Sequence, residues 1–384
     1  MPNTQIDSQP DTKIDFIYLN EPDMTRAGVT DMPACVDAMT DVLDLFARGD
    51  YRMAGPENNA HGAQVYFPET ETFPGMPVDG PDRRFMAMPA YLGGDCQVTG
   101  CKWYGSNVEN KQRGLPRSIP MFTLNDKDTG DPLAIMSANL LSAYRTGAIP
   151  GVGARFLARE DAKVVGIVGP GPMNRTSLEA FMAVRPEINH VKVAGRGQAG
   201  VDAFIAWARE KFPQITMIEQ VADMEQAVRD SDIVSIAVPS KMGSENYPYV
   251  ADEWVKPGAF ICCSAHLALE ESLVTRARHV ADARKIYEAW AEEIPAPVHE
   301  TVGIWGMHLV DRVNDGRMTR AQFEDLGEII GGSSEGRKND DEVIIFSVGG
   351  MPVEDVAWAT QVYRNAVERG IGTPLNLWDT PALA

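Results

Sequence analysis

Cysteine is scarce in this sequence. The 384 residues include five cysteines and no Cys-x-x-Cys pair, too few for a disulfide framework at this length. Cys96 and Cys101 have no neighbouring histidines in a metal-site pattern, and Cys262 and Cys263 lie in an apolar run typical of a buried strand. We therefore expect no metal and a reducing, cytoplasmic environment.

Basic charge and long apolar runs are also missing. Lys and Arg number 35 against 54 Asp and Glu, a formal charge of −19 that repels phosphate backbones and anionic lipid headgroups. No run approaches the ~18 apolar residues that a membrane helix needs, and the amino terminus does not resemble a secretion signal. Nucleic acid and membrane are therefore excluded as expected partners.

What is present is a globular composition with two kinds of secondary-structure pattern. Short β-prone runs between residues 85 and 136, separated by turn signals, predict a small sheet domain. From Lys163 onward, strand-like and helix-like stretches alternate, which predicts a parallel sheet with helices on both faces. The expected fold class is α/β, a doubly wound parallel sheet plus an α+β domain.

Three further elements can be predicted individually. Helical spacing of apolar residues predicts a helix from Asp31 to Gly49, with Gly49 able to end it, and a second from Met351 to Arg369. Val343 to Ser347 is expected to form a strand. The stretch from Gly55 to Pro81 is rich in Gly, Pro and Asn, and we expect it to be irregular and to line a pocket.

A glycine turn follows the first strand of the alternating region. The apolar run Val164 to Val168 leads into Gly169-Pro-Gly171-Pro172-Met173-Asn174 and then into a helix-compatible stretch. In the Rossmann-type arrangement the first glycine permits a tight turn and the second lets the backbone approach a pyrophosphate at a helix amino end. An ordinary proline-containing turn is the alternative. The predicted cofactor-binding residues are Gly169, Gly171, Pro172, Met173, Asn174, Arg196, Val238 and Pro239.

Arg196 bears on which dinucleotide binds. In NAD-specific versions of this fold an acidic residue about 20 residues beyond the turn binds the ribose hydroxyls. Here the second strand ends in Val193-Ala-Gly-Arg196, with no acid. A guanidinium suits a 2′-phosphate, so NADP(H) is favoured and NAD(H) is the alternative. A solvated surface arginine is the other interpretation.

Three stretches of the chain together resemble the ornithine cyclodeaminase/μ-crystallin family. They are Gly100 to Asn110 with Gly114-Leu-Pro116, Asp126 to Met136, and Leu141 to Ala148. Closing segments of the family also appear, at Trp254 to Gly258, Gly336 to Val343 and Val353-Glu-Asp355. The resemblance implies a substrate domain of residues 1–147 plus 326–384, a dinucleotide domain of residues 148–325, and homodimers formed through the substrate domains.

The resemblance also implies candidate site residues. Lys102 matches the family's active-site lysine, and Arg145 matches the arginine of its Arg-Thr motif. A guanidinium can bind a substrate carboxylate through two hydrogen bonds, and an ammonium can bind it too or carry a proton. The alternative is a solvent-facing Lys102 and a structural ion pair for Arg145.

Two departures from the family pattern change the expected chemistry. The aspartate that serves ring closure in the cyclodeaminase is absent after Gly258, and its nearest counterpart is His266 or Leu267. Ornithine cyclisation is therefore not favoured, and His266 is a candidate proton relay or a packed histidine. The family's amino-terminal substrate arginine has no clear equivalent, so Arg52, His61 and Arg117 are candidates to line the substrate pocket.

The sequence thus predicts an NAD(P)-dependent oxidoreductase acting on a small amino or imino acid. Arg145 and Lys102 would fix the carboxylate, and Lys102 or His266 would handle the proton on nitrogen. The alternatives are an ornithine cyclodeaminase with bound NAD and a non-catalytic NADPH-binding protein resembling a crystallin.

Overall fold

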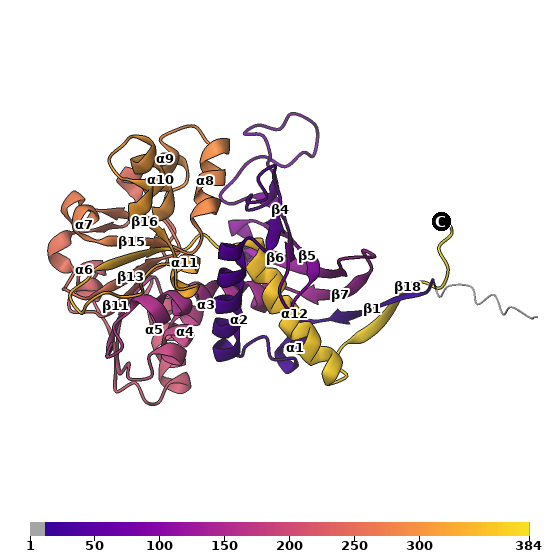
Figure 1. Cartoon of the computed structure of the whole chain (residues 1–384), viewed down its shortest axis with the longest axis horizontal. Helices are drawn as coiled ribbons and strands as arrows, with labels where there is room; N and C mark the ends of the chain where they lie inside the picture. The colour runs from indigo at the N-terminus through magenta and orange to yellow at the C-terminus, as the bar shows by residue number, and fades with distance from the viewer. Residues whose placement is uncertain (1–11, 384) are drawn as a thin grey trace, which may run out of the picture.

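The computed structural model describes residues 12–383. Two sheets lie at opposite ends of the molecule, with the helices α2 (Met32–Arg48), α3 (Asn139–Leu157) and α12 (Pro352–Glu368) between them (Figure 1). The helix predicted from Asp31 to Gly49 is confirmed as α2. The Asp31 side chain caps its first turn, and Gly49, with φ 80°, ends it. Among the described residues, no helix is both long and apolar enough to cross a bilayer.

The first sheet is mostly antiparallel and carries the β-prone runs of the amino-terminal half. Its order is β18-β1-β7-β6-β5-β4-β2, and β3 pairs with β4. The inner face packs on α12, while β1 and β18 extend from the body as an arm (Figure 1). The strands are β1 (Ile14–Leu19), β2 (Tyr51–Met53), β3 (Ala63–Val65), β4 (Arg84–Leu92), β5 (Val98–Ser106), β6 (Ser118–Asp126), β7 (Pro132–Ser137) and β18 (Thr373–Trp378).

The second sheet is parallel throughout, in the order β10-β9-β8-β11-β13-β17-β15-β16. The chain runs outward from β8 to β10 and then returns to β11, so the order reverses between β8 and β11. This confirms the predicted doubly wound sheet. The strands are β8 (Val164–Val168), β9 (His190–Ala194), β10 (Met217–Gln220), β11 (Ile233–Ile236), β13 (Phe260–Cys263), β15 (Arg278–Ala281), β16 (Phe323–Asp325) and β17 (Ile344–Ser347).

Short and medium helices connect these parallel strands. Two of these helices lie near the site described below. Helix α4 (Pro172–Val184) follows the glycine turn after β8, and α8 (Arg284–Glu293) faces the first sheet (Figure 1). The others are α5 (Gln198–Lys211), α6 (Met224–Val228), α7 (Glu271–Arg276), α9 (Val298–Thr301), α10 (Trp305–Asn314) and α11 (Leu326–Ile330), while α1 (Glu21–Arg26) belongs to the first half.

The structure differs from the predicted domain boundaries at two places. They assigned residues 326–384 to the substrate domain, whereas β17 pairs with β13 and β15 inside the parallel sheet. All four residues of β17 are buried, as expected for a central parallel strand. In addition, α3 runs across the predicted boundary at residue 147. The chain therefore enters the parallel sheet once more before α12 returns to the first sheet.

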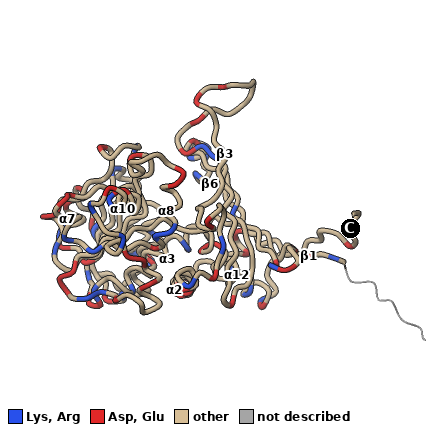
Figure 2. The backbone as a smooth tube through the Cα atoms, turned by 45° about the horizontal axis from the view of Figure 1, so that its top comes forward, with Lys and Arg blue, Asp and Glu red and all other residues tan. Residues whose placement is uncertain are grey.

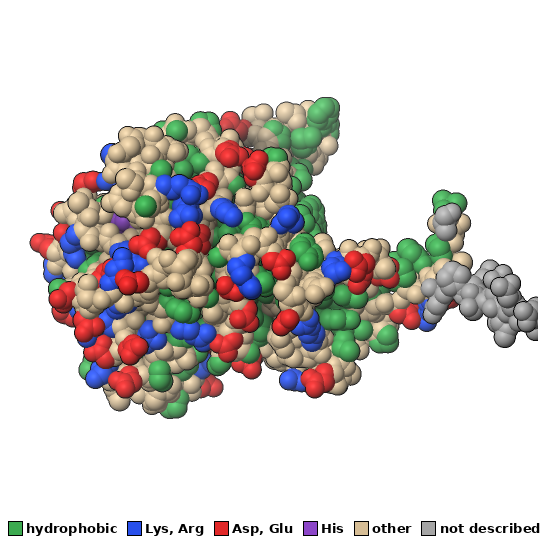
Figure 3. Space-filling view, in the orientation of Figure 1, with side chains coloured by type: hydrophobic (Ala, Val, Ile, Leu, Met, Phe, Trp, Pro, Cys, Tyr) green, Lys and Arg blue, Asp and Glu red, His purple; other side chains and the backbone are tan. Residues whose placement is uncertain are grey.

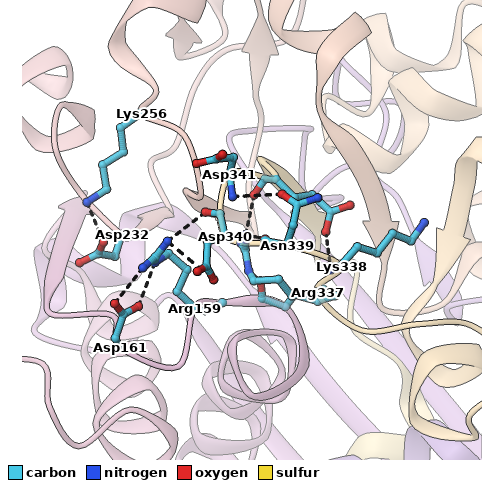
Figure 4. Close-up of polar contacts among 12 residues, drawn as sticks. Arg159, Asp161, Asp232, Lys256, Arg337, Lys338, Asn339, Asp340 and Asp341 are labelled. Carbon is cyan, nitrogen blue, oxygen red and sulfur yellow. Dashed lines mark hydrogen bonds and ion pairs between the residues drawn. The ribbon is translucent and has the colours of Figure 1, made fainter.

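The segment from Gly336 to Val343, which resembles a closing segment of the family, has a structural role. Arg337 donates to Leu157 O at 2.7 Å, and Arg159 donates to Asp340 O at 3.1 Å (Figure 4). Beside them, Asp232 accepts from the Val164 backbone N–H at 2.8 Å. These contacts tie the end of α3 to the amino-terminal edge of the parallel sheet, which is the edge opposite the glycine turn.

Candidate active site

The glycine turn lines a cavity of about 1060 Å³ at the carboxyl edge of the parallel sheet. Gly169 has φ +93°, and a Cβ on it would lie 2.6 Å from Ala237 O, so the turn requires glycine there. A Cβ on Gly171 would meet no heavy atom within 4 Å, so the space beside Gly171 is open. Predicted cofactor residues that line the cavity are Gly169, Gly171, Arg196, Val238 and Pro239.

The other three predicted cofactor residues do not line this cavity. Pro172 and Met173 begin α4, and the Asn174 side chain is fully buried beneath the turn. Its Nδ2 donates to Val168 O at 2.9 Å and Gly169 O at 2.8 Å, and its Oδ1 accepts from the Ser235 hydroxyl at 2.7 Å. Asn174 therefore fixes the shape of the turn, and its side chain is fully used by the protein.

The cavity has the features that a dinucleotide requires. No side chain of the described residues caps the amino end of α4, so its first N–H groups remain available to a phosphate. Arg196 lies on the cavity wall, exposed, and within residues 12–383 its guanidinium has no hydrogen-bond or ion-pair partner. The volume is at the upper end of small-molecule sites, roughly 300–1,000 Å³. The residues present thus fit a dinucleotide.

A buried ionic cluster connects the first sheet to α3 and α12. Lys102, on β5, donates through Nζ to Asp355 Oδ2 at 2.8 Å and to the Ser142 hydroxyl at 3.2 Å. Arg145, on α3, donates through Nε to Asp355 Oδ1 at 2.9 Å and through Nη1 to Glu354 Oε2 at 2.7 Å. The structure therefore brings Lys102 and Arg145 together, with one carboxylate shared between them.

The cluster changes the protonation of its members. Burial and the neighbouring Arg145 lower the pKa of Lys102 to about 8. Burial raises the pKa of Glu354 to about 7, although Arg145 opposes this. Burial alone would also raise the pKa of Asp355, but Arg145 and Lys102 hold it below its usual value. An ammonium that titrates near neutral pH can both bind an anion and exchange a proton.

His61 completes the cluster from the irregular segment before β3. Its Nδ1 lies 3.0 Å from Gly350 O, and its ring centroid lies 4.9 Å from that of Trp290 on α8. Burial and the charges of Lys102 and Arg145 lower the pKa of His61 to about 3, so the ring is neutral at pH 7. Because a carbonyl only accepts, Nδ1 carries the proton and Nε2 presents a lone pair.

The turn after β17 holds His61 and Arg145 in place. Asp282, which follows β15 and is fully buried, accepts from the backbone N–H groups of Gly349 at 2.7 Å and Gly350 at 2.9 Å. Gly350 has φ +76°, and a Cβ on it would lie 2.8 Å from Arg145 Nη1. Asp282, which follows a strand of the second sheet, thus supports the cluster through the Gly349–Gly350 turn.

Polar atoms are left over within the cluster for a ligand. Two of the three Lys102 donors are used, and among the described residues Arg145 Nη2 has no partner. With His61 Nε2 these atoms provide two cationic donors and one neutral acceptor. That combination suits a carboxylate next to an amine or imine nitrogen.

The remaining predicted site residues lie elsewhere. Arg52 is exposed on β2 and donates to Gly49 O at 3.1 Å, so the alternation of β2 turns it away from the cluster. The His266 ring contacts the Ser240 hydroxyl at 2.7 Å and the Tyr247 ring, which places it behind the cavity wall. Arg117 pairs with Asp82 at 3.1 Å, further along the first sheet.

Sequence reasoning assigned no role to Glu354, Asp355 or Asp282. A signal for the first two was present, because adjacent acids interrupt the apolar face of the helix predicted from Met351 to Arg369. Asp282 is a single acid after a strand and gives no comparable signal. Within residues 12–383, no group of three or more His, Cys, Asp or Glu side chains is placed to hold a metal ion.

The parallel sheet with its order reversal and glycine turn defines a Rossmann-type α/β protein with an additional antiparallel-sheet domain. More specifically, the chain belongs to the ornithine cyclodeaminase/mu-crystallin family, whose sequence profile matches residues 29–370. This confirms the resemblance found in the sequence.

Individual relatives cover most of the chain. The N-((2S)-2-amino-2-carboxyethyl)-L-glutamate dehydrogenase of Staphylococcus aureus is 27% identical over 373 residues, covering 95% of this chain and 99% of that protein. The delta(1)-pyrroline-2-carboxylate reductase of Bacillus cereus is 29% identical over 302 residues, covering 78% and 87%. An archaeal alanine dehydrogenase dimer with bound NAD has a TM-score of 0.75 at 24% identity, covering 95% and 100%.

Proposed function

We propose that this protein is an NAD(P)-dependent oxidoreductase that interconverts a CH–NH group and a C=N group in a small amino or imino acid. The observation that carries the proposal is the buried Lys102–Arg145 cluster, with unused donors, in a chain that also has an open dinucleotide-type cavity. The relatives named as a dehydrogenase of an amino-acid adduct and a reductase of a cyclic imino acid support the same reaction class.

In this proposal each residue has a defined task. The Arg145 Nη2 and Lys102 Nζ donors bind the substrate carboxylate, since charge-assisted hydrogen bonds orient it firmly. Asp355 fixes both cations, and Asp282 holds the turn against which Arg145 and His61 pack. A bound nicotinamide would accept or supply the hydride.

The proton on nitrogen falls to Lys102 or His61. Removing hydride and one proton from CH–NH leaves C=N, so one group must take that proton and return it in the reverse direction. Lys102, with a pKa near 8, and the neutral His61 Nε2 both lie in the cluster. His266 lies behind Ser240 instead, so we assign it no part in this step.

Arg196 supports a choice between the two dinucleotides, and the cysteines support a choice of compartment. Within the described part of the chain Arg196 has no protein partner, and no acid follows β9 directly; both features favour a 2′-phosphate and hence NADP(H), with NAD(H) as the alternative. All five cysteines are free thiols, which supports the reducing cytoplasm as the compartment.

The outer face of the first sheet supports a homodimer. Phe85, Trp103, Ile119 and Met121 alternate onto this face and remain 42–52% exposed. Figure 3 shows hydrophobic side chains along the half of the molecule that carries this sheet and the arm, among charged side chains that are found on both halves. Contiguous exposed apolar surface marks an interface, and we propose a second copy as its occupant. Trp103→Lys should convert a dimer into a monomer in light scattering; a monomeric parent would contradict this.

Absorbance at 340 nm tests the function directly. Amino acids with NADP⁺ or NAD⁺, and 2-oxo acids with amines and NADPH or NADH, should show turnover for at least one substrate. Conversion of ornithine to proline and ammonia without net change of cofactor would instead identify a cyclodeaminase. Tight dinucleotide binding with no turnover across the panel would identify a non-catalytic binding protein.

A further inference from the structure

We infer that the substrate carries a second carboxylate, bound by Arg84 and Arg117 on the far side of the Tyr104 ring from Lys102. The inference rests on the proposed function, because it places this second subsite next to the Lys102–Arg145 cluster.

Strand register places the subsite on the same face as the cluster. Lys102, Tyr104 and Ser106 alternate along β5, so their side chains share the inner face of the sheet. Arg84 on β4 lies directly opposite Ser106, and Ser118 on β6 lies opposite Ser106 on the other side. Arg84, Ser106 and Ser118 thus form one row across the sheet, here called the Arg84 row. It lies four residues along β5 from Lys102, roughly 13 Å of strand.

The Tyr104 ring lies between the two cationic groups. Lys102 Nζ is 5.8 Å from the ring centroid, and Arg84 Cζ is 6.0 Å from it. The long Lys102 and Arg84 side chains thus both approach the ring, one from each row. A ligand with a carboxylate at each end can bind Lys102 and Arg145 at one end and the Arg84 row at the other.

The charges in the Arg84 row do not balance. Asp82 forms ion pairs with both Arg84 and Arg117, the latter at 3.1 Å, and also accepts from the Ser106 hydroxyl at 2.6 Å. Two guanidinium groups therefore share one carboxylate and leave one net positive charge. Figure 2 shows both basic and acidic segments at the foot of the projecting loop, near the β3 label. A second carboxylate would neutralise the charge.

Two buried or half-buried donors in this region lack adequate acceptors. Among residues 12–383, Arg84 Nε is enclosed and has no hydrogen-bond partner. The Tyr104 hydroxyl donates to the thioether sulfur of Met86, at 3.0 Å, and thioethers are weak acceptors. A buried donor without a partner costs about 1–3 kcal/mol, so native structures rarely contain one. The Arg84 and Arg117 side chains are partly exposed and would present the donors that a second carboxylate can reach.

The segments that flank Arg84 and Arg117 are held by hydrogen bonds and an ion pair. The Asn107 N–H donates to Arg117 O at 2.9 Å, which joins the two ends of the β5–β6 connection. Arg83 donates to Val78 O at 3.1 Å and pairs with Glu109 at 3.0 Å. Arg83 is therefore bound to the loop and gives a matched control for Arg84.

Binding of simple dicarboxylates to the dinucleotide-loaded protein tests the inference without requiring turnover. Glutarate or adipate should raise the melting temperature and show a Kd at least about ten-fold below that of valerate, which has one carboxylate. Arg84→Met and Arg117→Met should each remove this preference while valerate binding stays within two-fold. Arg83→Met should leave the preference unchanged.

The outcomes separate this inference from the proposed function. Equal affinity for valerate and the dicarboxylates in the parent protein would overturn the second subsite, whatever the turnover assay shows. A preference that persists in both the Arg84→Met and Arg117→Met variants would overturn the assignment to this row. Arg117 is half exposed, so its variant remains informative if Arg84→Met fails to fold.

Discussion

Substituting Gly171, the second glycine of the turn, should weaken dinucleotide binding while the stability of the fold changes little. Gly171 has φ −89°, which any residue adopts, and a Cβ there meets no protein atom within 4 Å. Gly171→Ala should therefore cost only about 0.5–1 kcal/mol of stability, from the poorer helix cap. The new methyl group would occupy the space beside the free N–H groups of α4. Losing one charge-assisted hydrogen bond of about 1.5–3 kcal/mol weakens binding by about 10- to 100-fold.

Gly169 provides the matched contrast. Its φ of +93° and the 2.6 Å approach to Ala237 O mean that Gly169→Ala must strain the backbone, by about 1–2 kcal/mol for the dihedral angle alone. Fluorescence titration with NADPH and thermal unfolding should show weak binding with near-parental stability for Gly171→Ala, and reduced stability for Gly169→Ala. Unchanged NADPH affinity in Gly171→Ala would refute the cofactor site.

Three other substitutions test the remaining parts of the site. Lys102→Met should lower turnover at 340 nm by about 100-fold or more while the dinucleotide Kd stays within two-fold; loss of dinucleotide binding would contradict its role. The unfolded chain binds a proton at His61 with pKa 6.5 and the folded chain only at about 3, so acid favours unfolding. Between pH 7 and pH 5, the free energy of unfolding measured in urea should therefore fall by about 2 kcal/mol more in the parent than in His61→Gln. An equal fall in both proteins would refute the claim that the His61 ring is buried in its neutral form. Arg196→Leu should raise the Kd for NADPH about ten-fold and leave that for NADH nearly unchanged; equal effects would remove the basis for NADP(H).

Local signals in the sequence were sufficient for single elements. The Asp31 cap and the terminal Gly49 set the bounds of α2, and the strand–turn–helix pattern at Gly169 located the cavity. These features depend on residues within a few positions of one another. The resemblance to the family then supplied Lys102 and Arg145.

Contacts between distant residues were not predictable in the same way. The partner of Lys102 is Asp355, 253 residues further along the chain, and nothing near Lys102 indicates which acid pairs with it. The strand β17 shows the same limit, because its apolar run predicts a buried strand but not the sheet that contains it. Asn174 was expected at the cofactor because it occupies a motif position, while its side chain serves the turn itself.

The role of the Lys102–Arg145 cluster is tested most directly by a crystal structure with NADPH and the best substrate of the turnover panel. The pyrophosphate should lie beside Gly171, and the substrate carboxylate should lie within hydrogen-bond distance, about 3 Å, of both Arg145 Nη2 and Lys102 Nζ. A substrate bound away from both side chains, or a dinucleotide bound outside the glycine turn, would contradict it.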